Sequence, residues 1–520
     1  PAKVKGESYL RPAASAAPYT SRGSRTVEAT DPDCTADQVH IALGDDLGSM
    51  VVSYATYAYD TAAKVTFAHS EDAVMSDSSA ATVVTGTTRV NSELLYIITR
   101  LTEPTMGEPA ATPEEIIALQ DTSTWAYDKE TGEHFFNWYN VTEVQHGFGD
   151  YNNPYMIYDS PMLHTVVLTG LEPLVTYYYR VEGSCDVHQF TMPPFSYDTA
   201  VPDDELYPFL MGMVGDLGQT QVSVGSMEAL ADMEPDTVLL VGDLCYADGY
   251  ESIWDTFGRA FEIIGAQVPV MTTGGNHAEV QSGENWVPYS LRYKTPFESS
   301  GSHNPAYWGR EIGPIHVIAV NSYAGTFNTS IQYTWLKNYL STRINRARTP
   351  WVVLMTHTPW YCSNTIHWKE GELTRLSMES MAYEYGVDIV LSGHIHAYER
   401  TLNVFDEALD PCGPMHLIIG DGGNYEGPAT PWRVETDTGG APEWSAFRES
   451  SFGVGGLNIV NSTHAFFSWS RHACASDSED TYHMNFSSSC VTPDDNSANA
   501  MDQSDEVWVV RPSKSTCPNR

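Results

Sequence analysis

Side chains that can bind a metal ion follow five apolar segments of this sequence, each at the point where the segment ends. Such segments are typical of buried strands, and α/β domains build their sites at the carboxyl ends of strands. A single Asp or His after a strand is most often a buried structural residue. Five strand ends that each supply such a group favour a metal site instead. The groups are Asp216, Asp243 with Tyr246 three residues later, Asn276, His357, and the pair His394 and His396.

The elements that must position these groups follow residue 203. Apolar runs such as FLMGMV, TVLLV and WVVLMT alternate there with amphipathic patterns. We expect the helices at residues 223–234, 252–265, 332–344 and 372–386. Uninterrupted apolar strands are buried on both faces of their sheet. The pattern therefore predicts an α/β domain over residues 201–472, with layered β-sheets flanked by helices.

The chain before this domain reads as a β-sandwich. Short strands separated by turn residues are expected at 38–44, 50–56, 64–69, 164–171 and 176–183. The run 170–173 (Gly-Leu-Glu-Pro), followed by Tyr177, Tyr179 and Val181, resembles the fibronectin type III pattern. We expect this sandwich over 34–200, with an insertion near 91–153. Residues 1–33 read as an extended lead-in, and 473–520 as a polar carboxyl-terminal tail with one strand candidate at 506–510.

The charge balance excludes two classes of partner. The net charge is −40 and arises from scarce Lys and Arg, 27 in all, because only 18% of residues are charged. Such a chain repels nucleic acid and anionic membrane surfaces, so we expect neither as a partner. We find no run of eighteen apolar residues, and therefore predict no membrane span.

Several features favour a secreted or vacuolar protein. The chain opens at Pro1 without a leader sequence, which we interpret as a processed or trimmed form, so the missing leader says little about location. Sequons occur at Asn140, Asn328, Asn461 and Asn485. The eight cysteines contain no C-x-x-C pair, so a zinc ribbon is a poor interpretation. Disulfides are expected in the late cluster Cys474, Cys490 and Cys517, with their partners undetermined.

The order G-D-x-G, G-D-x-x-Y, G-N-H, an isolated His and G-H-x-H resembles the metallophosphoesterase superfamily. Tyr246 narrows the resemblance to the purple acid phosphatases. The resemblance covers about residues 205–472. The preceding sandwich is similar to the amino-terminal domain of the large plant-type members. The resemblance implies an α/β metallophosphoesterase domain with a binuclear metal site.

The resemblance also assigns ligands to two metal ions. Hard carboxylate and phenolate oxygens suit Fe(III), while imidazole and amide suit a divalent ion, Zn(II) or Mn(II). Two neighbouring ions clamp a phosphate and lower the pKa of a bound water. They also supply the positive charge that this acidic chain otherwise lacks. The implied ligands are Asp216, Tyr246 and His396 for iron, Asn276, His357 and His394 for the divalent ion, and Asp243 as the bridge.

The resemblance implies that two further residues act on the substrate and that a third orients one of them. His277, beside the ligand Asn276, contacts the phosphate, and His367 protonates the leaving group. Glu370 orients His367. Two departures from the family pattern bear on substrate preference. Ile366 stands where plant-type members often have a second histidine, and Ala278 where an acidic residue usually follows G-N-H.

We therefore expect an acid phosphatase that hydrolyses phosphate monoesters. A phosphodiesterase or nucleotide pyrophosphatase on the same scaffold is the alternative, which Tyr246 disfavours, and an inactive binding protein is a further one. The substrates are expected to be small phosphomonoesters, with phytate and nucleotides left open, and a homodimer is a further expectation. Cys245 and Cys362 lie beside expected site residues. Without the metal set they would suit a catalytic Cys–His pair, and otherwise packing or a disulfide.

Overall fold

The computed structural model describes residues 34–56, 61–76, 78–89, 161–195, 203–247, 252–277, 286–367, 369–433, 441–472 and 501–517. The expected lead-in 1–33 and insertion 91–153 lie outside these ranges. So do the sequons Asn140 and Asn485 and the cysteines Cys474 and Cys490. No helix within the described ranges is both long enough and apolar enough to span a membrane.

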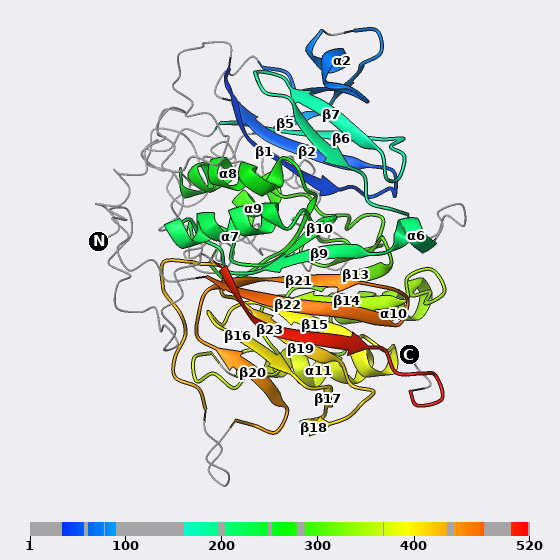
Figure 1. Ribbon diagram of the computed structural model, residues 1–520, viewed down its shortest axis with the longest axis vertical. Coiled ribbons are helices and arrows are strands. Elements are labelled where there is room, and N and C mark those ends of the chain that lie inside the picture. Colours follow the sequence, from blue (N-terminus) through cyan, green and yellow to red (C-terminus); the bar gives the residue numbers. More distant parts are fainter. Residues whose placement is uncertain are drawn as a thin grey trace, which may run out of the picture.

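The first unit is a sandwich of two four-stranded antiparallel sheets, seen in blue and cyan in Figure 1. One sheet has the order β1 (Ala36–Leu43), β2 (Met50–Thr56), β6 (Met162–Leu168), β5 (Thr87–Arg89). The other has the order β4 (Thr82–Thr85), β3 (Lys64–Ala68), β7 (Thr176–Val181), β8 (His188–Thr191), and the short helix α2 (Glu71–Met75) lies beside β3 and β7. A disulfide joins Cys34 to Cys185 and thereby ties the start of β1 to the turn after β7.

The second unit contains two large mixed sheets. The first has the order β11 (Val270–Thr273), β10 (Thr237–Val241), β9 (Phe209–Val214), β21 (Gly453–Ile459), β22 (His464–His472), β23 (Met501–Val510). The second has the order β12 (Trp308–Ile312), β13 (Ile315–Val320), β14 (Trp351–Thr356), β15 (Ile389–Ser392), β19 (Met415–Ile419), β16 (Tyr398–Thr401), β20 (Ser445–Glu449). The hairpin β17 (Val404–Phe405) and β18 (Ala408–Leu409) stands apart.

The two large sheets pack face to face with helices outside. Met213 and Val241 of the first sheet share a core with Val317 and Val353 of the second. The outer face of the first sheet packs on α7 (Gln221–Asp232) and α8 (Ser252–Gly265). The outer face of the second packs on α10 (Ile331–Arg343) and α11 (Glu372–Glu384). Successive strand residues point to opposite faces, so strands buried on both faces read as continuous apolar runs. The remaining described helices are α6 (Asp203–Leu206) and α9 (Val287–Arg292).

Local signals set the helix starts. Thr220 and Ser223 form a reciprocal capping box at the start of α7, and Ser330 accepts a hydrogen bond from the Tyr333 amide at the start of α10. Such caps satisfy amides that have no partner within the helix. The four helices expected in the α/β domain are found, with ends shifted by at most two residues.

The expectation of a polar tail after residue 472 was incomplete. β23 pairs antiparallel with β22 along its length and forms an edge of the first large sheet. The strand candidate 506–510 is the end of this longer strand. Cys517 of the expected late cluster does form a disulfide, but its partner is Cys412, far outside the cluster.

Candidate metal centre

The residues expected at strand ends converge at one edge of the molecule's second unit. Asp216, Asp243 and Asn276 follow β9, β10 and β11, which are parallel neighbours in the first sheet. His357 and His394 follow β14 and β15, which are parallel neighbours in the second. Parallel strands end at the same edge of a sheet, and the two sheets are packed face to face. The five strand ends therefore meet around one point.

One group of side chains joins a phenol, a carboxylate and an imidazole. The Tyr246 hydroxyl lies 3.0 Å from His396 Nε2 and 3.3 Å from Asp216 Oδ1. His396 Nε2 lies 3.6 Å from the same carboxylate oxygen. All three side chains are predominantly buried. The group is a compact set of two oxygen donors and one nitrogen donor.

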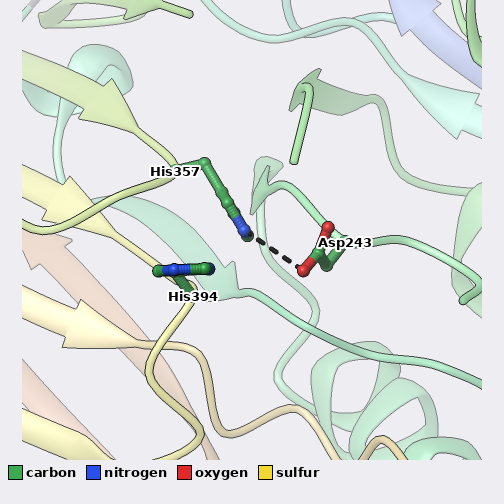
Figure 2. A group of neighbouring side chains, drawn as sticks. All are labelled: Asp243, His357 and His394. Atoms are coloured by element: carbon green, nitrogen blue, oxygen red, sulfur yellow. Dashed lines mark ion pairs between the residues drawn. The ribbon is translucent and has the colours of Figure 1, made fainter. Parts of the chain in front are cut away.

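A second group gathers around His357 (Figure 2). His357 Nε2 lies 3.2 Å from Asp243 Oδ2 and 3.1 Å from Asn276 Oδ1. The ligand atoms of Asp243, His357 and His394 lie within 4.8 Å of one another. This spacing matches donors that surround one small cation.

The two groups fit metal ions on their own chemistry. Asp243 Oδ2 is buried and makes no well-aligned hydrogen bond in the described structure, although His357 Nε2 lies 3.2 Å away. A buried carboxylate oxygen without a well-formed hydrogen bond is unfavourable unless a cation or another donor satisfies it. The Tyr246 group offers hard oxygens, and the His357 group offers imidazoles with an amide oxygen. The donors present therefore fit two unlike ions.

Partners outside the two groups orient the histidines. His357 Nδ1 lies 2.8 Å from the Val241 carbonyl oxygen, so Nδ1 carries the proton and Nε2 is left as the ligand atom. His394 Nε2 lies 2.7 Å from Glu370 Oε2. That contact leaves Nδ1 of His394 as the nitrogen available to a metal. A carboxylate or carbonyl behind a ligating imidazole is the usual support in metal sites.

The electrostatics of the site favour a cation. Burial alone would raise the pKa of Asp243, but His357 and His277 outweigh burial and hold that pKa below its ordinary value. Burial would likewise lower the pKa of His357, yet Asp243 and Asp216 raise it to about 9. Burial, with Asp216 and Asp243, raises the pKa of Tyr246 well above its ordinary value. The carboxylates thus produce a negative field that a positive ion would relieve.

The backbone at the strand ends is constrained. Asp216, Asp243, Tyr246 and His394 have φ between 46° and 68°, a region that non-glycine residues rarely adopt. Such strain persists where surrounding structure holds it, typically at functional sites. Gly393 explains the glycine in G-H-x-H, because a Cβ there would lie 2.3 Å from Asp216 Oδ2. This glycine gives the carboxylate room beside the strand end.

The three residues expected to act on substrate lie around the groups. The His277 amide donates to Asp243 Oδ1 over 2.8 Å, and its ring lies 4.3 Å from that of Tyr246. His367 is half exposed, and its ring lies 4.7 Å from that of His394. Glu370 accepts hydrogen bonds from both His367 Nδ1 and His394 Nε2. The hydrogen bonds from these two histidines, His394 first, lower the pKa of Glu370 to about 2.

Sequence reasoning missed several residues of the surrounding structure. Tyr323 donates to Asn276 Oδ1 over 3.0 Å, and Glu426 Oε1 lies 3.6 Å from His277 Nε2. The side-chain amide of Asn424 donates to the Asp216 carbonyl oxygen. The only available signal was the glycine-rich run before Asn424. Tyr323 and Glu426 follow no motif that sequence alone identifies.

Cys245 and Cys362 do not form the disulfide that was kept as one option. Both are buried thiols, in different apolar clusters. Burial raises the pKa of Cys362 well above its ordinary value, which disfavours a reactive thiolate. Packing is therefore the role of Cys362 that the structure favours.

Comparisons with known proteins agree with this geometry. Residues 209–398 match the family model described as calcineurin-like phosphoesterase. Residues 413–480 match the family model described as iron/zinc purple acid phosphatase-like protein C. A solved purple acid phosphatase from yellow lupin (Lupinus luteus) seeds aligns with a TM-score of 0.61 and 18% identity, over 84% of this chain and 72% of that one. The structural match supports the shared fold.

Relatives in sequence identify the family. Purple acid phosphatase 18 of Arabidopsis thaliana is 40% identical over 321 residues, covering 61% of this chain and 70% of that protein. Phosphoenolpyruvate phosphatase of Allium cepa is 36% identical over 345 residues, covering 62% and 69%. With the two family models and the converging metal donors, these matches show that the chain belongs to the purple acid phosphatases, metal-dependent enzymes that hydrolyse phosphate monoesters at a binuclear site.

Proposed function

We propose that this chain is an acid phosphatase whose binuclear centre holds Fe(III) beside a divalent ion, Zn(II) or Mn(II). The observation that carries the assignment is the asymmetry of the two groups of donors. Tyr246 lies with Asp216 and His396, whereas Asn276 lies with His357. A phenolate oxygen favours the harder ferric ion, and imidazoles favour the divalent one. Asp243 is proposed to bridge the two ions.

The protein's own groups bind and orient the phosphate. The metal pair, when bound, supplies an activated water and neutralises charge on the phosphate during in-line displacement. The backbone amide of His277 donates a hydrogen bond to Asp243, and its ring contacts Tyr246, so both interactions hold the residue in place. We assign it the role of donating a hydrogen bond to a phosphate oxygen. Glu426 Oε1 lies 3.6 Å from its Nε2 and adds negative charge beside that nitrogen.

Leaving-group protonation is proposed for His367. Its Nδ1 hydrogen bond to Glu370 leaves Nε2 to hold the transferable proton. Because Glu370 also accepts from His394, one carboxylate fixes both a metal ligand and the acid. This arrangement places the proton donor at a set position relative to the divalent site. Glu370 is a positioning residue in this scheme.

Small phosphomonoesters are the proposed substrates. Phosphoenolpyruvate is the first one to assay, because the Allium cepa relative is named for it. We also propose a secreted or vacuolar location. Its support is the two described disulfides, which persist in oxidising compartments, and the exposed sequons at Asn328 and Asn461. Phytate hydrolysis and a homodimer stay predictions.

Metal analysis with a visible absorption spectrum tests the metal assignment. We expect about one iron and one divalent ion per chain, and a visible band from phenolate-to-iron charge transfer. Tyr246→Phe should bleach the band and keep the fold, since the ring is retained. Tyr425→Phe is the matched control, because Tyr425 packs edge-on against Tyr246, with ring centroids 5.6 Å apart, and is not a proposed ligand. Two zinc ions without iron would disprove the iron assignment.

Parallel assays with p-nitrophenyl phosphate and bis(p-nitrophenyl) phosphate test the reaction. A phosphomonoesterase should prefer the monoester strongly. A preference for the bis ester would support the phosphodiesterase alternative. Inactivity on both, with both metals bound, would support a protein that binds without catalysis.

A further inference from the structure

A cleft lies where the sandwich meets the second large sheet, and the metal centre does not use it. Its volume is about 580 Å³. It is lined by Asp45 and Leu47 from the turn after β1, by residues 309–311 and 316 of the second sheet, and by residues 339 and 342–345 at the end of α10. The lining includes none of the proposed ligands or substrate-contacting residues. The cleft is therefore a separate feature of the molecule.

Arg310 forms part of its wall, and two of its buried nitrogen atoms have no hydrogen-bond partner in the described part of the chain. The residue is 5% exposed, and its Nη2 donates to the carbonyl oxygens of Asp46 and Leu47, at 3.0 and 3.4 Å. Its Nε and Nη1 are buried and make no hydrogen bond within the described part of the chain. Burial lowers the pKa of Arg310 to about 10, so the side chain remains cationic at neutral pH. Asp45, Asp46 and Glu311 attract this cation, but the buried Nε and Nη1 still lack a hydrogen-bond acceptor, which is unfavourable until an acceptor or an anion satisfies them.

Other arginines make this region positive. Arg343 and Arg348 also line the cleft, and Arg348 pairs with Glu311. Burial, together with Arg346, Arg348 and Arg343, lowers the pKa of His316 in the same lining to about 3. The chain has only 27 Lys and Arg and a net charge of −40, so this convergence is a local exception.

The acidic groups do not cancel this positive charge. The lining contains two carboxylates, those of Asp45 and Glu311, against three guanidinium groups. Asp45 Oδ1 accepts a hydrogen bond from the Ser299 amide, and Glu311 is paired with Arg348. Counting three positive and two negative side chains leaves one positive charge in excess. The side-chain amide of Asn345 adds a neutral donor, whereas the Thr342 hydroxyl donates to the Asn338 carbonyl oxygen.

We propose that this cleft is a second anion site, which binds a small oxyanion of the phosphate class through Arg343, Arg348 and the field of buried Arg310. The planar guanidinium fork matches the oxygens of a tetrahedral oxyanion. The acidic remainder of the surface repels nucleic acid and anionic membranes, so a small soluble anion is the ligand class that fits. The bound anion also strengthens the contact between sandwich and catalytic unit, because Arg310 holds the turn at Asp46 and Leu47.

Equilibrium dialysis of the metal-loaded enzyme with radiolabelled inorganic phosphate tests the proposal. The wild type should bind two phosphates per chain, one at the metal centre and one in the cleft. Arg343→Gln removes one exposed cleft arginine and should weaken the second site by roughly tenfold. The first site and the phosphatase activity should stay unchanged. A defective metal centre would instead abolish the first site and the activity, which separates the two proposals.

Lys337→Gln is the matched control. Lys337 lies on α10, is exposed and does not line the cleft, so this change removes the same charge from the same helix. It should leave both phosphate sites intact. One phosphate per wild-type chain, or equal binding in the Arg343→Gln and Lys337→Gln variants, would overturn the proposal.

Discussion

Asp243 contacts groups on both sides of the metal centre. Its Oδ2 lies 3.2 Å from His357 Nε2. Its Oδ1 accepts a hydrogen bond from the backbone amide of His277, whose ring packs on Tyr246. A side chain in this position can reach both proposed ions, whereas Asn276 Oδ1 lies within hydrogen-bond distance of His357 and Tyr323. The two residues therefore differ in what their loss removes.

Asp243→Ala should release both metals, because two cations would be left close together with less negative charge between them. Asn276→Ala, the matched variant, should mainly weaken the divalent site and retain iron. Elemental analysis after dialysis measures both contents. Equal metal retention in the two variants would refute the bridging role of Asp243.

His367→Ala separates proton donation from phosphate binding. A poor leaving group needs a proton as its bond to phosphorus breaks, whereas p-nitrophenolate leaves without one. The variant should slow alkyl phosphates by roughly a hundredfold, in the range of general acid catalysis, and p-nitrophenyl phosphate much less. Steady-state kinetics on both substrates measure the difference.

Ile366→Ala is the control for that variant, because Ile366 is the neighbouring exposed side chain. It should leave the ratio between the two substrates unchanged. Equal slowing of both substrates by His367→Ala would mean that His367 positions phosphate. No slowing would mean that it is a surface histidine without a role in the reaction.

At the scale of elements, α8 and β1 join the two units through buried ionisable groups. The Val39 amide donates to Glu262 Oε1 over 2.7 Å, and Arg259 pairs with Asp37. The Tyr179 hydroxyl donates to the Ala266 carbonyl oxygen from the sandwich side. Burial raises the pKa of Asp37 to about 6. Burial, with the Asp37 carboxylate, raises the pKa of Glu262 to about 8.

Stability should therefore fall as pH rises. A carboxyl group with a raised pKa in the folded state stabilises the fold below its unfolded pKa, near 4 to 4.5. That contribution is lost as the pH passes about 6 for Asp37 and about 8 for Glu262. The melting temperature should decrease between pH 5 and 9. Calorimetry across this range checks the slope.

Glu262→Gln should flatten the upper part of that dependence, because the amide cannot ionise and still accepts the Val39 hydrogen bond. Glu384→Gln, at the exposed end of α11, is the control and should keep the wild-type slope. A melting temperature that rises toward pH 9 in the wild type would contradict the assignment.

Strands and helices around the ligands were predictable because their signals are local. β9, β10 and β14 are uninterrupted apolar runs, and each is followed by a proposed ligand that sequence alone marked. β16 and β20 were missed, since their short segments contain charged residues such as Glu399, Arg400 and Arg448. Glu399 is fully buried and accepts hydrogen bonds from Ser363, a partner distant in sequence. Pairing of this kind depends on the tertiary structure.

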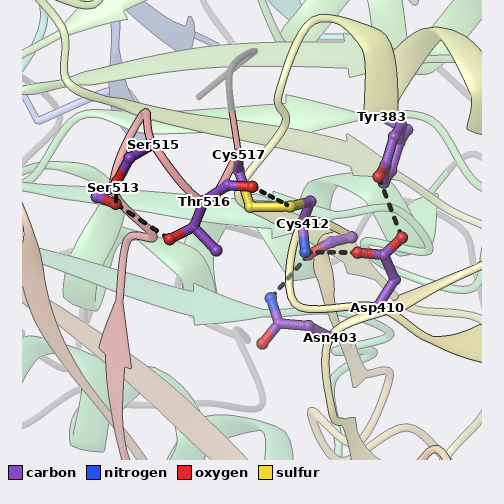
Figure 3. Close-up of a disulfide and its surroundings, with 9 residues drawn as sticks. Tyr383, Asn403, Asp410, Cys412, Ser513, Ser515, Thr516 and Cys517 are labelled. Carbon is purple, nitrogen blue, oxygen red and sulfur yellow. Dashed lines mark hydrogen bonds between the residues drawn. A yellow bond between two sulfur atoms is a disulfide. The ribbon is translucent and has the colours of Figure 1, made fainter.

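At the scale of the whole molecule, the far end of the chain completes the catalytic unit. β23 is the edge strand beside β22, and Asp505 accepts hydrogen bonds from Tyr398 and Arg400 of the other large sheet. Beyond β23, Cys517 is joined to Cys412, whose amide donates to Asp410 (Figure 3). The disulfide therefore joins the segment after the last described strand to the loop that precedes β19 of the second sheet.

Removing this disulfide should destabilise the protein without altering its metals. The bridge closes a segment with a sequence separation of 105, and loss of such a bridge typically costs roughly 2–5 kcal/mol. The double variant Cys412→Ser, Cys517→Ser should melt at a lower temperature and retain iron and the divalent ion. Thermal denaturation and elemental analysis measure these effects. An unchanged melting temperature would show that strand pairing alone holds β23.

The place of β23 also has a consequence for biosynthesis. β9 begins at Phe209, but the sheet that contains it is complete only when residues 501–510 pair with β22. A chain emerging from the ribosome in sequence order can therefore form the sandwich early, whereas Tyr398 and Arg400 gain their contact with Asp505 only after residue 505 has been synthesised. A nascent chain stalled before residue 501 should carry an open sheet edge along β22, the kind of surface that chaperones bind.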